Sequence, residues 1–210
     1  MRKLFSRQLI EARHEMLSIY EAVDLSLHDA VNAFIANDKD LGKKAQRAAD
    51  HVDARSANLE AVCYNLIATQ SPVASDFRLL QTIIYVNFNL QRMSDKVRRI
   101  ARAAKRKVNN DIEFPAEMVA LIEQEAASVY QVLGSTAAAL VNNDLAAVLA
   151  LSEEDEAVHG AYQEFFRVFN RTETMEVADD AQMDDFRRTV MVSRYLDRIA
   201  NISMESAYRL

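Results

Sequence analysis

Apolar residues recur at every third or fourth position along most of the chain, a spacing that is typical of an amphipathic α-helix. In the stretch from Leu4 to Ile35 these positions are Leu9, Met16, Ile19, Val23, Leu27, Val31 and Phe34. Polar segments interrupt the pattern and divide the chain into six such stretches. The stretches cover approximately residues 4–35, 41–70, 76–109, 115–141, 145–170 and 183–208. The pattern therefore predicts six long helices.

The scarcity of turn-forming residues leads to the same conclusion. Only three glycines and two prolines occur among 210 residues, so the chain has few places to reverse direction, which favours an all-α fold over many short strands. No apolar run approaches the roughly 20 residues that span a bilayer, and the N-terminal segment lacks the apolar core of a secretory leader. The single cysteine, Cys63, excludes an intramolecular disulfide. These features together favour a cytoplasmic protein.

The two halves of the chain carry similar segments. NLQRMSD in the third stretch corresponds to YLDRIAN in the sixth, at a separation of 106 positions. Further upstream, Leu41 aligns with Leu145 at a separation of 104, which predicts two extra residues in the second copy. We interpret the chain as a duplicated unit of three antiparallel helices. The fold expected is two tandem three-helix bundles, one in residues 1–109 and one in residues 115–210.

Four motifs connect this duplicated chain to a known family. SPVASDFR begins at Ser71, and LQRMSDKVRRIA follows at Leu90. YLDRIANIS, which begins at Tyr195, is a second copy of the LQRMSDKVRRIA motif. DHVDARSANLE begins at Asp50, before the other three motifs. These segments resemble the motifs Q-P-x-A-x-D-L-R, L-E-R-I-G-D-x-x-x-N-I-A and D-x-x-V-D/N-x-L-E of the PhoU family of phosphate-uptake regulators. The resemblance extends over the whole chain.

This resemblance implies a regulatory adaptor rather than an enzyme. Such an adaptor couples a phosphate ABC transporter, through its ATPase subunit, to a sensor histidine kinase, and it represses the phosphate-starvation response when phosphate is plentiful. A homodimer that reaches the membrane only through its partners is expected, and its effect on transcription is indirect. A PhoU-like regulator of another transporter is the alternative within the family. The sequence also lacks a Gly-rich phosphate loop and the G-x-S-x-G and H-E-x-x-H motifs.

A polar stripe follows the third helix of each predicted bundle. In the first half it consists of Asn87, Gln91 and Asp95, which lie four residues apart and therefore share one helix face. In the second half it consists of Ser193, Asp197, Asn201 and Glu205. The resemblance implies that each stripe faces the second helix of its own half and binds metal through carboxylates.

The metal ligands implied by the resemblance are Asp53, Asp95, Asp155, His159 and Asp197. Oxygen ligands with one imidazole suit iron, zinc, manganese or magnesium. One carboxylate of each family pair is an amide here, Gln91 in the first half and Asn201 in the second. A network of interhelical hydrogen bonds, or a solvated face, is therefore the alternative interpretation of the stripes.

A ferritin-like di-iron oxidase is an alternative from a different functional class. Its sites use Glu-x-x-His steps on facing helices of a four-helix bundle. The chain contains two such steps, one from Glu11 to His14 and one from Glu156 to His159. They fall on the first and fifth predicted helices, so we expect them to lie in different three-helix units.

Basic residues gather near the end of the third predicted helix. Arg98, Arg99, Arg102 and Lys105 are candidate docking residues for an acidic partner or an anionic membrane surface, because few neutralising carboxylates are expected nearby. The alternative is that these cations solvate the helix end and complement its dipole. Nucleic acid is not expected as a direct partner, since the net charge is −6 and no aromatic residues interleave with the run.

Overall fold

The computed structural model describes residues 2–106, 116–171 and 180–210, and within these ranges it contains six α-helices and no strand. The helices are α1 (Arg2–Ile35), α2 (Lys39–Gln70), α3 (Ala74–Arg106), α4 (Ala116–Asn142), α5 (Leu145–Phe169) and α6 (Asp180–Ala207). The prediction of an all-α protein with six long helices is confirmed. The third helix was predicted to end at Asn109 and the fourth to begin at Pro115, and both residues lie outside the described ranges. The same two residues were the predicted boundary between the bundles, so that boundary lies outside the described ranges as well.

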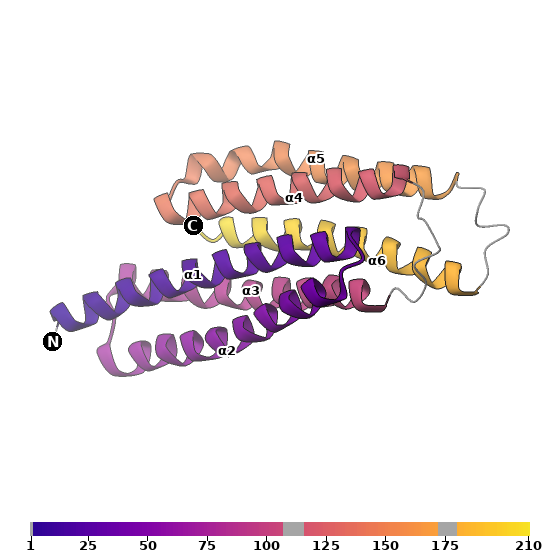
Figure 1. Ribbon diagram of the computed structural model, residues 1–210. Helices are drawn as coiled ribbons and strands as arrows, with labels where there is room; N and C mark the ends of the chain where they lie inside the picture. The colour runs from indigo at the N-terminus through magenta and orange to yellow at the C-terminus, as the bar shows by residue number, and fades with distance from the viewer. Residues whose placement is uncertain (1, 107–115, 172–179) are drawn as a thin grey trace.

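The helices lie along one long axis and form two groups of three (Figure 1). Helices α1, α2 and α3 pack on one another, and so do α4, α5 and α6. Two further contacts, between α3 and α6 and between α1 and α4, join the groups along their length. One continuous core of buried apolar residues therefore runs through both halves. That the two groups are separate domains of a duplicated chain stays a prediction.

The first turn of each group has the same construction. Asn37 and Asn143 adopt left-handed backbone conformations with φ of 55° and 53°, which asparagine tolerates better than most residues. The next residues, Asp38 and Asp144, cap α2 and α5 by accepting bonds from the helices' first amides. Asp144 lies 106 positions after Asp38, the same separation as the motifs downstream. The two-residue insertion predicted for the second copy is therefore wrong, because the turns and not the leucines fix the alignment.

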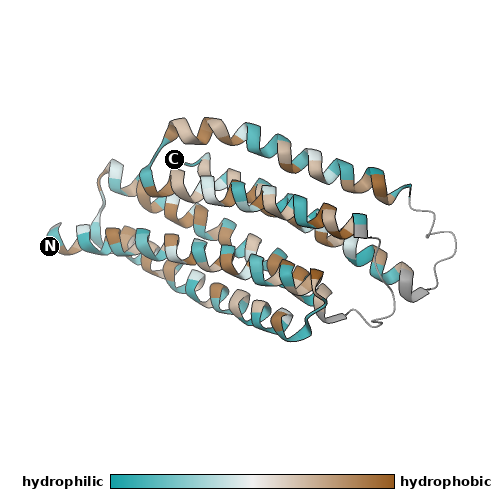
Figure 2. Cartoon of the chain, turned by 45° about the horizontal axis from the view of Figure 1, so that its top comes forward, coloured by the Kyte–Doolittle hydropathy of each residue, from teal (hydrophilic) through white to brown (hydrophobic). Residues whose placement is uncertain are grey.

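Hydrophobic and hydrophilic residues alternate along the helices, as the colours in Figure 2 show, and the buried hydrophobic residues form the core. Ile19 and Leu27 of α1, Leu90 of α3 and Phe165 of α5 are fully buried. Each such side chain contributes about 1.5–3 kcal/mol through removal from water. Cys63 is buried among them, and burial raises the pKa of its thiol to about 11, so it packs as a small apolar residue. None of the helices in the described ranges is both long and apolar enough to cross a membrane.

Candidate functional site

The polar stripe of α3 binds α2 through buried hydrogen bonds. The Asn87 side-chain amide donates to the backbone carbonyl of Ser56 at 2.9 Å, and the Ser94 hydroxyl donates to that of Ala49 at 3.0 Å. All four residues are buried, and the small side chains at positions 49, 56 and 94 allow the two helices to approach closely. Asn87 of the stripe, together with Ser94 beside it on α3, therefore forms an interhelical hydrogen-bond network, which was the alternative to metal binding.

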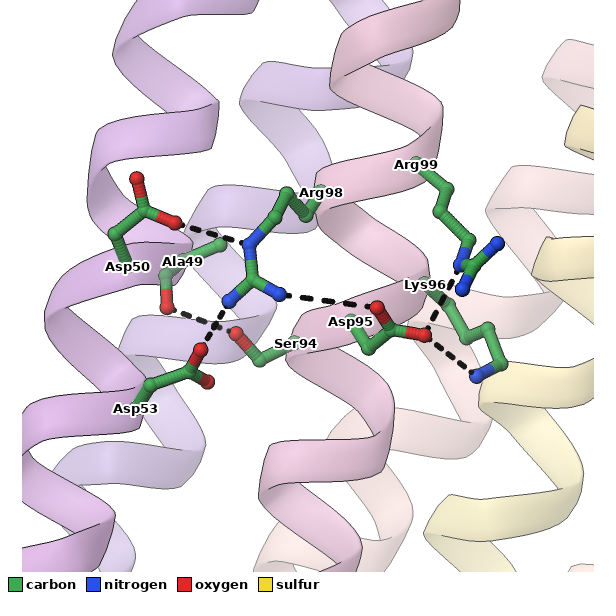
Figure 3. A network of polar contacts seen from close by, with 8 residues as sticks. All are labelled: Ala49, Asp50, Asp53, Ser94, Asp95, Lys96, Arg98 and Arg99. Atoms are coloured by element: carbon green, nitrogen blue, oxygen red, sulfur yellow. Dashed lines mark hydrogen bonds and ion pairs between the residues drawn. The ribbon is translucent and has the colours of Figure 1, made fainter.

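Arg98 occupies the centre of the candidate metal site in the first half (Figure 3). Its Nε donates to Asp50 Oδ1 at 2.9 Å, its Nη2 donates to Asp53, and its Nη1 lies 3.7 Å from Asp95 Oδ1. The Arg98 side chain is only 14% exposed. A guanidinium thus neutralises the carboxylates that the resemblance assigned to a metal ion. The expectation that few carboxylates lie near this basic run is wrong, because α2 brings two of them to Arg98.

The other oxygen of Asp95 is also bound by cations. Asp95 Oδ2 accepts hydrogen bonds from Lys96 Nζ at 3.1 Å and from Arg99 Nε at 3.0 Å. Partial burial acts to raise the pKa of Asp95, but the hydrogen bonds from Lys96 and Arg99 outweigh it and hold that pKa below its usual range. Asp95 is therefore ionised and surrounded by protein cations. The arrangement of the first half does not fit a metal site.

In the second half, Asp155 and His159 of α5 lie near Asp197 of α6. Burial raises the pKa of Asp197, the positive charges of Arg198 and His159 oppose the increase, and the negative charge of Asp155 adds to it. His159 Nε2 lies 2.8 Å from the side-chain amide nitrogen of Gln163, and Asn201 donates to the backbone carbonyl of Asp197 at 2.9 Å. The side chains of Asp155 and His159 are therefore close enough to Asp197 for their charges to act on its carboxyl group.

Metal binding itself stays a prediction. Within residues 2–106, 116–171 and 180–210, no three or more His, Cys, Asp and Glu side chains are arranged so that they could hold a metal ion. The second half has no arginine at the position equivalent to Arg98, since Met204 stands 106 positions after Arg98 and is buried, although the charge of Arg198 also acts on Asp197. Of the two polar stripes, the one on α6 is therefore the better candidate.

Glu125 of α4 is a buried acid that the sequence interpretation missed. Its side chain is fully buried, and the hydroxyl of Ser193 on α6 is the polar group that lies near its carboxylate. Burial raises its pKa to about 8, the interaction with Ser193 opposes the increase, and the charge of Asp197 adds to it. The sequence does indicate this burial, because Glu125 lies three residues after Ile122 and four before Val129, at a helical position where an apolar residue is expected.

The remaining basic candidates lie in two different environments. Arg99 is 51% exposed, Arg102 is exposed, and both line a cleft where α3 meets α6. Arg98 instead points toward α2, so the predicted docking run is divided between two faces of α3. The side chain of Lys105 lies outside the described part of the structure.

The two Glu-x-x-His steps do not form a common site. Glu11 accepts a hydrogen bond from Arg7 at 2.8 Å, and His14 lines a cleft between α1 and α4. His159 lies on α5, which packs on α4 and α6. The two steps belong to different three-helix groups, as expected, so the geometry gives no support to a ferritin-like di-iron centre.

Comparisons with known proteins agree with the fold and the motifs. Residues 16–104 match the family model of the PhoU domain. A Clostridium acetobutylicum protein described as "Phosphate-specific transport system accessory protein PhoU homolog" is 25% identical over 201 residues, which make up 95% of this chain and 89% of that protein. A Serratia marcescens "Phosphate-specific transport system accessory protein PhoU" is 25% identical over 197 residues, or 94% of this chain and 79% of that protein.

A solved structure extends the comparison to three dimensions. The crystal structure of PhoU from Pseudomonas aeruginosa superposes with a TM-score of 0.88 at 23% sequence identity, covering 98% of this chain and 96% of that one. At this level of identity the likeness shows the shared fold. Both three-helix groups and the contact between them are therefore part of a known architecture.

Proposed function

Because the chain belongs to the PhoU family, we propose that it is a regulatory accessory protein of phosphate transport and not an enzyme. The observation that carries the proposal is the similarity to curated phosphate-transport accessory proteins over nearly the whole chain, 95% in one relative and 94% in another. The fold of two three-helix groups, with similar motifs in both halves of the sequence, supports the same role.

The mechanism proposed is protein docking in the cytoplasm. The protein, expected to act as a homodimer, contacts the ATPase subunit of a phosphate transporter and the cytoplasmic region of a sensor histidine kinase. When phosphate is plentiful, this contact represses both uptake and the starvation response. Long exposed helix faces provide docking surface, and the cations of Arg99 and Arg102 accelerate encounter with an acidic partner. A related regulator of another transporter remains the second candidate.

Direct binding measurements test this mechanism. The purified protein is titrated against the transporter ATPase subunit and, separately, against the kinase's cytoplasmic region. A variant with Arg99→Glu and Arg102→Glu is expected to bind at least one partner about tenfold more weakly, with a smaller salt dependence. The control carries Arg47→Glu and Arg194→Glu, which change the net charge equally at exposed positions outside the cleft.

The possible outcomes separate the parts of the proposal. If both charge-reversed proteins bind like the wild type, Arg99 and Arg102 are not docking residues, although the adaptor role survives. If neither partner binds the wild-type protein at any salt concentration, the docking mechanism is wrong. Binding to the ATPase subunit of a different transporter, with none to the phosphate transporter, identifies the second candidate.

A further inference from the structure

A basic cleft lies at the contact between the two halves of the protein. It is lined by Arg99, Arg102 and Ala103 of α3 and by Arg187, Arg188, Met191 and Tyr195 of α6. Its volume is about 270 Å³, and it opens to solvent. Four arginines line it in a protein whose net charge is −6. The cleft is therefore a local exception to the charge of the whole chain.

Two of these arginines are held in place by carboxylates of their own helices. Arg188 Nη1 donates to Asp185 at 3.1 Å, and its Nη2 pairs with Asp184. Arg99 is held through Nε by Asp95 at 3.0 Å. The guanidinium carbon of Arg99 lies 5.9 Å from the centre of the Tyr195 ring, which fixes the group against α6. These contacts orient Arg99 and Arg188 at the cleft.

The other two arginines carry the excess charge of the cleft. Arg102 and Arg187 are exposed, and neither has a carboxylate within ion-pair distance among the described residues. They stand on different helices, α3 and α6, at the edge of one small hollow. Side chains of like charge repel one another, so holding them together is unfavourable unless an anion binds between them. Each side of the cleft therefore carries an arginine that makes no ion pair with a described residue.

We propose that this cleft binds a small phosphate-bearing anion, such as inorganic phosphate or the phosphate of a lipid headgroup. The planar guanidinium fork matches the oxygens of phosphate, and each arginine donates up to two parallel hydrogen bonds. The limited volume suits a single phosphate group better than an extended acidic peptide. The arginine geometry carries this site independently of any protein partner. Because α3 and α6 belong to different halves, the bound anion clamps the two three-helix groups together.

Calorimetric titration with inorganic phosphate tests the proposal directly. The wild-type protein is expected to bind phosphate saturably, with an affinity that falls as sodium chloride rises. Arg102→Gln and Arg187→Gln are each expected to weaken binding about tenfold or more, since each removes charge-assisted hydrogen bonds. Arg194→Gln removes an exposed charge from the same helix outside the cleft and is expected to leave the affinity unchanged. Circular dichroism confirms that each variant keeps its helical content.

A second arm distinguishes the source of the phosphate. Binding to phosphatidylglycerol vesicles is compared with binding to phosphatidylcholine vesicles for the same four proteins. Saturable binding of free phosphate identifies a soluble anion, whereas binding only to the phosphatidylglycerol vesicles, lost in Arg102→Gln and Arg187→Gln, identifies a lipid headgroup. The proposal is overturned if neither probe binds. It is equally overturned if binding is the same in the cleft variants and in Arg194→Gln.

Discussion

Glu125 offers a test of how burial shapes the stability of the second half. The pKa of its carboxyl rises from 4.5 to about 8 on folding, because the side chain is fully buried on the apolar face of α4. The folded protein therefore keeps this proton over a pH range in which the unfolded chain has released it. Its contribution to stability is complete below about pH 4.5 and is lost progressively as the pH rises toward about 8.

The size of the loss follows from the same pKa values. Keeping one proton that the unfolded chain releases costs about 1.4 kcal/mol for each pH unit above the unfolded pKa. Near pH 7.5, about three units above 4.5, the loss amounts to about 4 kcal/mol. Glu125→Gln replaces the acid with a neutral side chain of similar shape, so we expect it to raise the free energy of unfolding by about 2–4 kcal/mol near pH 7.5.

Urea denaturation followed by circular dichroism measures this effect. The wild type, Glu125→Gln and Glu123→Gln are unfolded at a series of pH values from about 5 to about 8. Glu123 is exposed on the same helix, so its substitution is expected to preserve the wild-type dependence on pH. In the Glu125→Gln variant, the free energy of unfolding is expected to fall much less with rising pH than in the wild type. A small fall is expected to remain because burial also raises the pKa of Asp197. If Glu125→Gln and the wild type lose stability in parallel, the buried acid does not control the slope.

Further substitutions probe the ion pairs, the core and the metal prediction. Arg98→Met is expected to lower the free energy of unfolding by about 1–3 kcal/mol, because it leaves three carboxylates without their shared cation, and an unchanged midpoint in urea would contradict this. Phe165→Ala empties a fully buried position and is expected to cost about 3–5 kcal/mol, against less than about 0.5 for Leu149→Ala at a site 77% exposed. Equal costs in urea unfolding would refute this view of the core. Any iron, zinc, manganese or magnesium is expected to bind only in the second half, so elemental analysis should find no metal in the double variant Asp197→Ala with His159→Ala. Metal retained by this variant would exclude Asp197 and His159 as ligands.

The helices were predictable because their signals are local. A repeat of three to four residues determines which side of a helix is apolar, and Asn37 with Asp38 ends one helix and caps the next within a few positions. The second copy of this turn, at Asn143 and Asp144, follows the same chemistry. The alignment error of two residues arose because leucines recur throughout amphipathic helices, whereas a turn occurs once.

The site was less predictable because it depends on which helices face each other. The basic run winds around α3, and only the packing of α2 shows that Arg98 turns inward while Arg99 and Arg102 face the cleft. Arg187 joined no sequence motif, since its relation to α3 requires the contact between α3 and α6. Glu125 could have been found as a charge at an apolar position, but a helical pattern alone does not show whether such an acid meets a partner.

Deletion of the gene from its organism of origin tests the regulatory role most directly. Phosphate uptake and a reporter of phosphate-starvation genes are measured in phosphate-rich medium, with and without a plasmid that restores the protein. Deletion is expected to raise both the uptake and the reporter signal, and the restored protein is expected to return them to the starting level. Unchanged uptake and an unchanged reporter in the deletion strain would contradict a role in phosphate regulation.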